Sequence, residues 1–182
     1  HETLDVTDPD AVREAMGIVS PAAVINCAGY TDVDGSEAAE LEALRLNGEA
    51  PKRLAEICKE SGALLVHFST DYVFDGAKRA PYVEDDAPNP LSAYGESKLA
   101  GERLARERCA RAVVVRVAAL FGIARSSGKG GTNFVETMLR AVASGRRLRV
   151  VADQVTAPSY TVDVARSVWR LVSAPAGIYH VS

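Results

Sequence analysis

The chain has 182 residues, of which 47% are hydrophobic and 25% are charged, and its formal net charge is −3. These values are ordinary for a soluble globular protein with one sizeable core, and they give no reason to expect nucleic acid or an anionic membrane as a partner. No apolar run is long enough to span a bilayer, and no signal segment opens the sequence. The three cysteines and three histidines lack metal-ligand spacing, which favours reduced thiols and no metal site.

The first half of the chain alternates between apolar runs and helical patterns. The apolar runs predict strands at 4–6, 22–27 and 63–68. Thr7 or Asp8, with Pro9 in the first turn, marks the start of a helix after the first strand. Two further helical stretches are expected before the third strand, one from Ser36 onward and one over 47–61.

The second half continues this alternation after an irregular loop at 75–90. Helices are expected at 91–109, 133–144 and 161–173, and strands at 112–117, 148–152 and 178–181. Gly145 stops the second of these helices, and 122–131 is a Gly/Ser loop. Strands and helices alternating at this spacing predict an α/β fold, a Rossmann-like doubly wound parallel sheet with helices on both faces.

The most informative segments are Ser69-Thr-Asp-Tyr-Val-Phe-Asp-Gly76 and Tyr94-Gly-Glu-Ser-Lys-Leu-Ala-Gly-Glu102. Thr70 ends a predicted buried strand, at the sheet edge where α/β folds bind ligands. Tyr94 and Lys98 are four residues apart in a predicted helix, so they share one face. An ammonium beside a phenol favours the phenolate, and we therefore expect Lys98 to lower the pKa of Tyr94 so that it exchanges a proton near neutral pH.

These segments closely resemble the dTDP-4-dehydrorhamnose reductase family of the short-chain dehydrogenase/reductase superfamily, from about Asp5 to the end of the chain. The resemblance implies reduction of the 4-keto group of a dTDP-linked 6-deoxyhexose by NADPH or NADH. It makes Tyr94 the proton donor, Lys98 the residue that also holds the nicotinamide ribose, and Thr70 a hydrogen-bond partner of the same substrate oxygen.

The resemblance also implies a cofactor site. The segment 26–34 is similar to the family's Asn-x-Ala-Ala-x-Thr-x-Val-Asp, with Gly29 in place of the second Ala, where a small residue lets the backbone approach the cofactor. Asp5 falls where the family contacts the adenine end, although a helix-cap role is equally open. Asn47 matches an Asn that supports the catalytic lysine. The expected cofactor contacts are Asp5, Val6, Cys27, Ala28, Gly29, Tyr30, Asn47, Ser69, Tyr94 and Lys98.

The substrate contacts implied by the resemblance are Thr31, Val33, Asp71, Tyr72, Asn133 and Gln154. In nucleotide-sugar dehydratases the corresponding string resembles Thr-Asp-Glu, and Tyr72 stands in place of that Glu, which favours a reductase. Asn133 lies in a segment similar to the family's Gly-Asn-Asn-Phe, and Gln154 in one similar to Asp-Gln-x-x-x-Pro. Ala119 replaces a family Trp that packs on the substrate, which leaves the identity of the sugar open.

We expect one NAD(P)-binding domain over 1–182, incomplete at its N-terminus, with substrate-binding elements within about 119–160 and at the C-terminal end. A Gly-rich pyrophosphate turn does not precede the first predicted strand, so the first strands of the fold are expected to be absent. Without the central strand, a gap would separate the strands at 4–6 and 22–27. The simplest hypothesis is that the chain is part of a longer protein.

Two other functions stay open. One is another nucleotide-sugar enzyme, an epimerase or a dehydratase, which recycles its NAD. The other is a non-catalytic dinucleotide-binding regulatory subunit of the methionine adenosyltransferase type, which an intact Thr-Tyr-Lys set does not exclude. The expected partner is a small-molecule nucleotide sugar, without nucleic acid or membrane, in the cytoplasm. A homodimer is left open.

Overall fold

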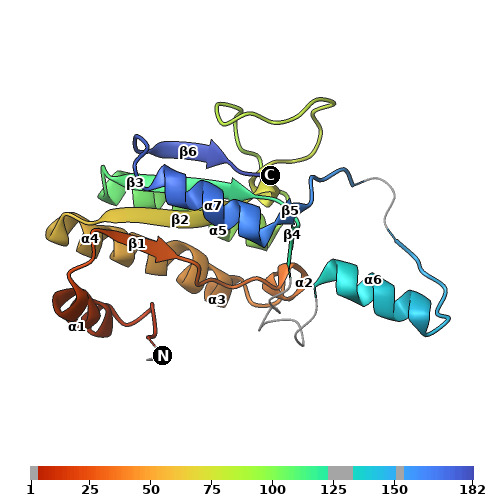
Figure 1. The fold of residues 1–182 in the computed structure, drawn as a ribbon, viewed down its shortest axis with the longest axis horizontal. Helices are drawn as coiled ribbons and strands as arrows, with labels where there is room; N and C mark the ends of the chain where they lie inside the picture. The colour runs from red at the N-terminus through yellow and green to blue at the C-terminus, as the bar shows by residue number, and fades with distance from the viewer. Residues whose placement is uncertain (1–3, 123–132, 151–153) are drawn as a thin grey trace.

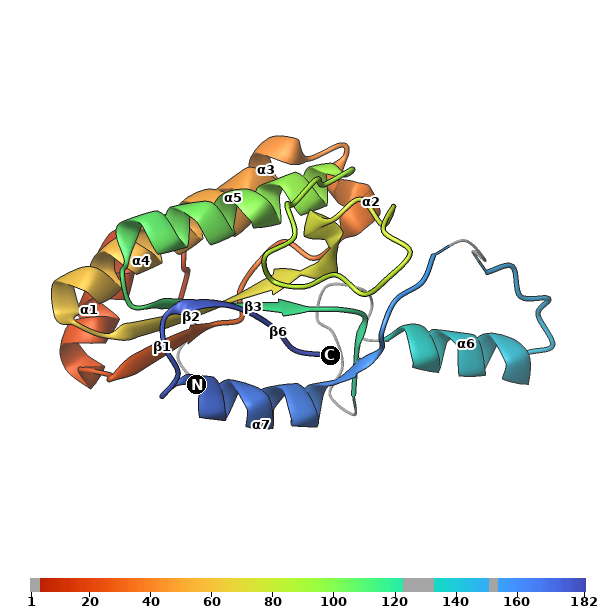
Figure 2. The same cartoon turned by 90° about the horizontal axis from the view of Figure 1, so that it is seen from above.

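The computed structural model describes residues 4–122, 133–150 and 154–182. A parallel four-stranded sheet forms its centre, with the strand order β1-β2-β3-β6 (Figure 1). The strands are β1 (Ala23–Asn26), β2 (Leu64–Thr70), β3 (Ala112–Val117) and β6 (Gly177–His180). Helices α4 (Ala50–Ser61) and α5 (Ala93–Arg108) cover one face, and α7 (Thr161–Leu171) covers the other (Figure 2). The predicted Rossmann-like parallel sheet with helices on both faces is confirmed.

The two core regions follow from side chains alternating along the central strands. On β2, Leu65 packs with residues of α4 and α5, whereas Leu64 and Val66 pack with Val164 and Val168 of α7. All six residues of β3 are buried. Strands covered on both faces read as continuous apolar runs, which is why β2 and β3 could be predicted closely from sequence.

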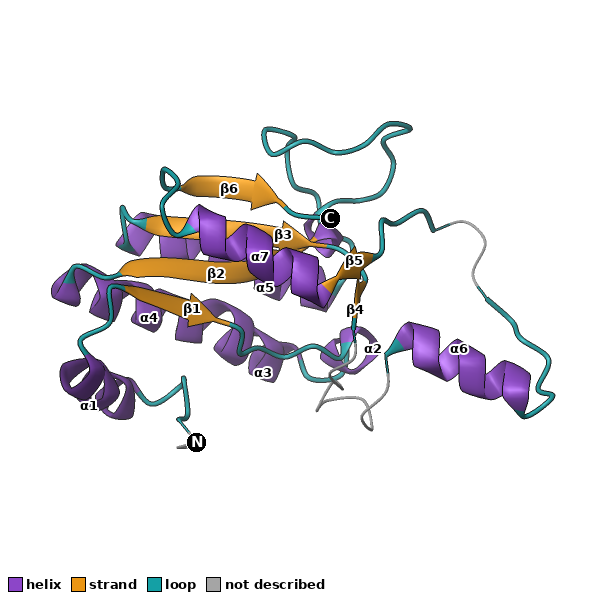
Figure 3. Ribbon diagram, in the orientation of Figure 1, coloured by secondary structure: helices purple, strands orange, loops and turns teal. Residues whose placement is uncertain are grey.

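The connection from β1 to β2 is helical but more divided than predicted (Figure 3). It contains α2 (Val33–Ser36), α3 (Glu40–Leu44) and a π-helical turn, η1 (Arg45–Glu49), which leads into α4. The prediction that Ser36 begins a helix is wrong, because Ser36 ends α2. The predicted helix at 47–61 is present as the end of η1 followed by α4.

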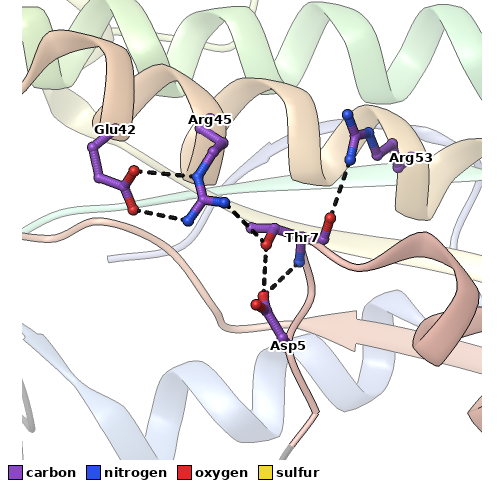
Figure 4. A network of polar contacts seen from close by, with 5 residues as sticks. All are labelled: Asp5, Thr7, Glu42, Arg45 and Arg53. Atoms are coloured by element: carbon purple, nitrogen blue, oxygen red, sulfur yellow. Dashed lines mark hydrogen bonds and ion pairs between the residues drawn. The ribbon is translucent and has the colours of Figure 1, made fainter.

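The predicted strand at 4–6 is also wrong. Residues 4 and 5 are irregular and residues 6 and 7 form a turn, which leads to α1 (Pro9–Val19). The carboxylate of Asp5 closes this turn by accepting hydrogen bonds from the backbone N–H and the hydroxyl of Thr7, both at 2.8 Å (Figure 4). A strand needs a hydrogen-bonded neighbour, and within the described residues β1 pairs only with β2. The predicted gap between two strands is therefore not formed.

The segment after β3 extends away from the sheet (Figures 1 and 2). Two unpredicted short strands, β4 (Leu120–Phe121) and β5 (Ser159–Tyr160), pair at its base, and α6 (Phe134–Ala143) lies between them in sequence. We call the described residues within 119–160 the arm. Residues 148–150 of the arm are irregular, so the strand predicted at 148–152 is wrong there, and its last two residues lie outside the described ones, as does most of the loop predicted at 122–131.

Side chains cap the starts of several helices, and these caps include Asp8, which was predicted, and Ser92, which was not predicted. Asp8 accepts hydrogen bonds from the N–H groups of Asp10 and Ala11 at the start of α1, and Ser92 accepts one from Gly95 at the start of α5. Gly145 has a φ of 70° after α6, which is the left-handed conformation of a helix stop. None of the described helices is long and apolar enough to cross a membrane.

Candidate active site

The three residues expected to carry the chemistry meet where β2 ends and α5 begins. Thr70 is the last residue of β2 and caps a short 3-10 turn, η2 (Asp71–Val73). Its hydroxyl oxygen accepts a hydrogen bond from the N–H of Tyr72 at 3.2 Å, and the hydroxyl donates to the carboxylate of Asp71 at 3.1 Å. The Thr70 hydroxyl also lies close enough to the phenol of Tyr94 to affect its pKa, so the end of the strand and the start of the helix meet at these two side chains.

The pKa of Tyr94 is raised, not lowered as predicted. Burial is the largest cause, the neighbouring Thr70 hydroxyl opposes it, and the electrostatic effects of Asp71 and Tyr72 raise the pKa further. Lys98 is not among the causes, and its ammonium donates to the carbonyl oxygen of Phe68 at 2.6 Å. The phenol therefore holds its proton firmly at neutral pH.

Lys98 is buried, with 6% of its surface exposed. Burial lowers its pKa to about 8, while the charges of Glu102 and Cys27 act in the opposite direction. Its ammonium lies beside the turn after β1, since a Cβ added to Gly29 would be 3.9 Å from Lys98 Nζ. Lys98 thus faces the predicted cofactor turn and titrates close to neutral pH.

The turn at 27–30 is held by two asparagines. Asn26 Oδ1 accepts a hydrogen bond from the N–H of Ala28 at 3.1 Å. The amide of Asn47 pairs with the backbone of Tyr30, accepting from its N–H at 2.9 Å and donating to its carbonyl at 3.0 Å. A Cβ on Gly29 would lie 2.7 Å from Asn47 Oδ1, so the side chain of any other residue would displace this amide.

Two residues that the sequence reasoning did not single out position the start of α5. The hydroxyl of Ser97 accepts a hydrogen bond from Asn47 at 3.0 Å and donates to the carbonyl of Tyr94 at 2.8 Å. Glu37 accepts a hydrogen bond from the N–H of Ala93 at 2.9 Å. Ser97 could have been found as a polar residue on the buried side of the Tyr94–Lys98 helix, whereas no sequence pattern indicates Glu37.

Part of the expected substrate set also converges. The ring of Tyr72 stands edge-on to that of Tyr94, with centroids 5.7 Å apart. From the arm, Gln154 Nε2 donates to the Tyr72 hydroxyl at 3.4 Å, and the hydroxyl of Thr156 donates to Asp71 at 3.2 Å. Thr156 was missed because a lone threonine in a loop carries no signal.

Of the remaining predicted residues, Asn133 has a local structural role, and for Thr31, Val33 and Ser69 only the position and exposure are defined. Asn133 caps α6 by accepting from the N–H of Glu136 at 2.9 Å, and it donates to the carbonyl of Gly122 at 3.0 Å. Thr31 is exposed, and Val33 begins α2. Ser69 is buried, and its hydroxyl has no hydrogen-bond partner among the described residues.

Asp5 and Val6 lie in the N-terminal turn. The hydrogen bonds from the backbone and hydroxyl of Thr7 lower the pKa of Asp5, and the guanidinium of Arg45 adds to this effect. Arg45 and Arg53 hold Thr7 against η1 and α4 by hydrogen bonds to its hydroxyl at 3.4 Å and to its carbonyl at 3.1 Å (Figure 4). Val6 packs against the core near α4. The carboxylate of Asp5 thus stabilises the local turn at residues 5–7.

Comparison with known proteins gives consistent matches over the whole chain. A family model described as RmlD substrate binding domain matches residues 1–182. The spore coat polysaccharide biosynthesis protein SpsK of Bacillus subtilis is 41% identical over 179 residues, which are 98% of this chain and 61% of that protein. A dTDP-4-dehydrorhamnose reductase of Streptomyces griseus is 42% identical over 186 residues, covering 98% of this chain and 59% of that protein.

A crystal structure of dTDP-4-dehydrorhamnose reductase from Bacillus anthracis in complex with NADP superposes on this fold with a TM-score of 0.90 and 36% sequence identity. The match covers 98% of this chain and 62% of that one. The chain therefore spans about three fifths of the length of the relatives that it matches.

Proposed function

The chain belongs to the family of the RmlD substrate binding domain, and from this membership and the geometry of the site we propose that it is an NAD(P)H-dependent oxidoreductase. It reduces the 4-keto group of a dTDP-linked 6-deoxyhexose. Several of its relatives are named for a reductase activity of this kind. The observation that carries the proposal is that Thr70 and Tyr94 meet at the carboxyl end of β2, with Lys98 one helical turn further on.

The residues around the turn after β1 fit a dinucleotide. Cys27 and Ala28 are exposed, and the Lys98 ammonium lies close to the adjoining Gly29. The buried hydroxyl of Ser69, near the end of the neighbouring strand, has no hydrogen-bond partner among the described residues. Lys98 would hold the ribose hydroxyls, and the turn would lie against the nicotinamide end. When bound, reduced nicotinamide supplies the hydride for the carbonyl. Both NADPH and NADH suit these residues.

Tyr94 is in the protonated form that a proton donor needs. Its raised pKa keeps the phenol protonated at neutral pH, and the Thr70 hydroxyl lies beside it. As negative charge develops on the substrate oxygen, the hydroxyls of Thr70 and Tyr94 stabilise it, and the proton moves from Tyr94 Oη to that oxygen.

The arm and the Asp71–Tyr72 turn are proposed to hold the nucleotide sugar, within one Rossmann-like domain over 1–182. Gln154 and Thr156 bring the arm to that turn, which supports this assignment. Thr31, Val33 and Asn133 complete the proposed substrate set, and Asp5, Val6, Tyr30 and Asn47 the proposed cofactor set. The protein is proposed to act in the cytoplasm on a small molecule.

The test is to mix the purified protein with NADPH and dTDP-4-keto-6-deoxy-L-mannose and to follow the absorbance of reduced nicotinamide. Rapid loss that disappears in Tyr94→Phe supports the reductase. Conversion of the sugar without net loss of NADPH would instead indicate an epimerase or a dehydratase. If the protein binds NADPH, turns over no keto sugar and is recovered with a methionine adenosyltransferase, the regulatory-subunit alternative replaces the proposal.

A further inference from the structure

His67 is a fully buried histidine in the middle of β2, and the proposed mechanism does not use it. It interrupts an otherwise apolar run, Leu64 to Phe68. Its Nδ1 lies 3.2 Å from the side-chain nitrogen of Asn26, the residue that holds the N–H of Ala28. His67 therefore stands directly behind the proposed cofactor turn.

The hydrogen bonds of Asn26 determine which ring nitrogen of His67 carries the proton. The backbone N–H of Ala28 can only donate, so the Asn26 atom that faces it is the carbonyl oxygen Oδ1. The NH2 group of Asn26 then faces His67 and needs an acceptor, which makes Nδ1 the unprotonated nitrogen. The imidazole is neutral, with its proton on Nε2.

The surroundings of His67 oppose a second proton. Burial holds the pKa of His67 well below its usual value, and the nearby ammonium of Lys98 lowers it further. The side chain of Asn26 that faces Nδ1 is uncharged, and so is the backbone of Gly101 and Asn47 that borders the space beside Nε2. The tautomer required by Asn26 is therefore the stable state of the ring throughout the neutral range.

The other ring nitrogen faces the second asparagine. A Cβ added to Gly101 of α5 would lie 2.0 Å from the carbonyl oxygen of Asn47 and 3.0 Å from His67 Nε2, so both atoms border the same small space. Nε2 has no direct partner among the described residues. One side of the imidazole thus supports Asn26, and the other side faces the backbone of Asn47, whose side chain holds Tyr30.

We propose that His67 is a positioning residue for the cofactor, which acts through Asn26 by accepting its NH2 group at Nδ1 and so fixing the Ala28 N–H and the turn at 27–29. This inference rests on the proposed function in taking that turn as the seat of the cofactor. It differs from a merely structural role because it depends on one acceptor atom and not on the volume of the ring.

Two substitutions separate the acceptor from the volume. In His67→Asn, Oδ1 takes the place of Nδ1 and can accept from Asn26. In His67→Gln, the amide reaches the place of Nε2 and leaves the NH2 group of Asn26 without an acceptor. Loss of a buried hydrogen-bond partner in the Gln variant should raise the Kd for NADPH about tenfold, whereas the Asn variant should stay within about threefold of the unmodified protein. Equal weakening in both variants would overturn the proposal.

Two measurements without cofactor keep this test independent of the proposed function. In the ¹⁵N spectrum of the full chain, His67 should show Nε2 protonated and Nδ1 unprotonated between pH 6 and 8, and Asn26→Asp should move the proton to Nδ1 because a carboxylate can only accept. Hydrogen exchange of the Ala28 amide should accelerate about tenfold in His67→Gln and not in His67→Asn. A proton on Nδ1 in the unmodified protein, or unchanged exchange in the Gln variant, would overturn the role of His67. If these results hold but NADPH does not bind, the proposed function fails instead.

Discussion

The two sides of the candidate site are built differently. In the block formed by β2, α5 and β3, Thr70 and Lys98 are buried, and the Thr70 hydroxyl and the Lys98 ammonium each have a defined hydrogen-bond partner. In the arm, α6 has no buried residue, and Phe134 and Leu139 are each 65% exposed. Gln154 reaches the block through a single hydrogen bond of 3.4 Å. The proposed proton donor therefore lies in a buried, ordered block, whereas the proposed sugar side is held by exposed hydrogen bonds of 3.4 and 3.2 Å from Gln154 and Thr156.

A buried ion pair also links the helix and one strand of the block. Glu102 of α5 and Arg116 of β3 form a bidentate ion pair at 2.8 and 2.7 Å, with both side chains almost fully buried. The guanidinium lies over the ring of Phe74, which stacks on Tyr82 of the 75–90 loop. The helix that carries Tyr94 is thus tied to the sheet and to the loop. Substitutions in the block should affect the chemical step or folding, and those in the arm should affect substrate binding.

The largest effect is expected for Tyr94→Phe. Removing the proton donor should lower kcat by about 10² to 10⁴-fold, while the Kd for NADPH should change little because only the hydroxyl is lost. Steady-state kinetics and a fluorescence titration of NADPH check both parts. A variant that keeps most of its turnover would show that another group donates the proton.

Breaking the ion pair should be the most damaging change for folding. Glu102→Leu leaves the Arg116 guanidinium buried without its partner and should lower the free energy of unfolding by about 3 to 5 kcal/mol. Replacing both residues, Glu102→Leu with Arg116→Met, should restore most of this loss because neither charge is then buried alone. Urea unfolding of the single and double variants provides the comparison, and a double variant as unstable as the single one contradicts this interpretation.

Lys98→Met should trade activity for stability. The pKa of Lys98 is about 8 in the folded chain and ordinarily 10.5, so between these values the unfolded chain binds more protons and the unfolding free energy rises with pH. Below pH 8 the full cost of burying the ammonium remains, and Lys98→Met should remove it, stabilising the protein by about 1 to 3 kcal/mol at pH 7.

This gain should fade as the pH rises from 8 to 10.5, whereas the loss of turnover should persist at every pH. Urea unfolding at pH 7 and pH 10 measures the difference. Lys59→Met, which removes an exposed lysine from α4, is the matched control and should show no such trend. The stabilisation of Lys98→Met relative to the unmodified protein should be larger at pH 7 than at pH 10. A larger stabilisation at pH 10 would contradict the predicted pH dependence.

The smallest effect is expected in the arm. Gln154→Ala removes one long hydrogen bond from an exposed side chain, so the free energy of unfolding should change by less than about 0.5 kcal/mol. The KM for the keto sugar should rise by about 2 to 10-fold with little change in kcat. A large loss of kcat would mean that the arm is as much a part of the catalytic geometry as the block.

The same contrast explains how far the sequence could be interpreted. β2 and β3 were predictable because strands covered on both faces are continuously apolar, and Thr70, Tyr94 and Lys98 were located by strand end and helix spacing. The partner of Lys98 was not predictable, since the carbonyl of Phe68 belongs to a strand 30 residues away. The turn at Asp5 depends on side-chain hydrogen bonds, and β4 and β5 are only two residues long, too short to show a pattern.

The most direct test of the central proposal is to follow the hydrogen itself. The protein is given dTDP-4-keto-6-deoxy-L-mannose and NADPH with deuterium at the nicotinamide C4, each diastereomer in turn, and the product sugar is analysed by mass spectrometry and NMR. We predict that one diastereomer places deuterium at C4 of the sugar, with one oxidised nicotinamide formed per product. A sugar converted without deuterium, or without net oxidation of the cofactor, would contradict the assignment as a 4-keto reductase.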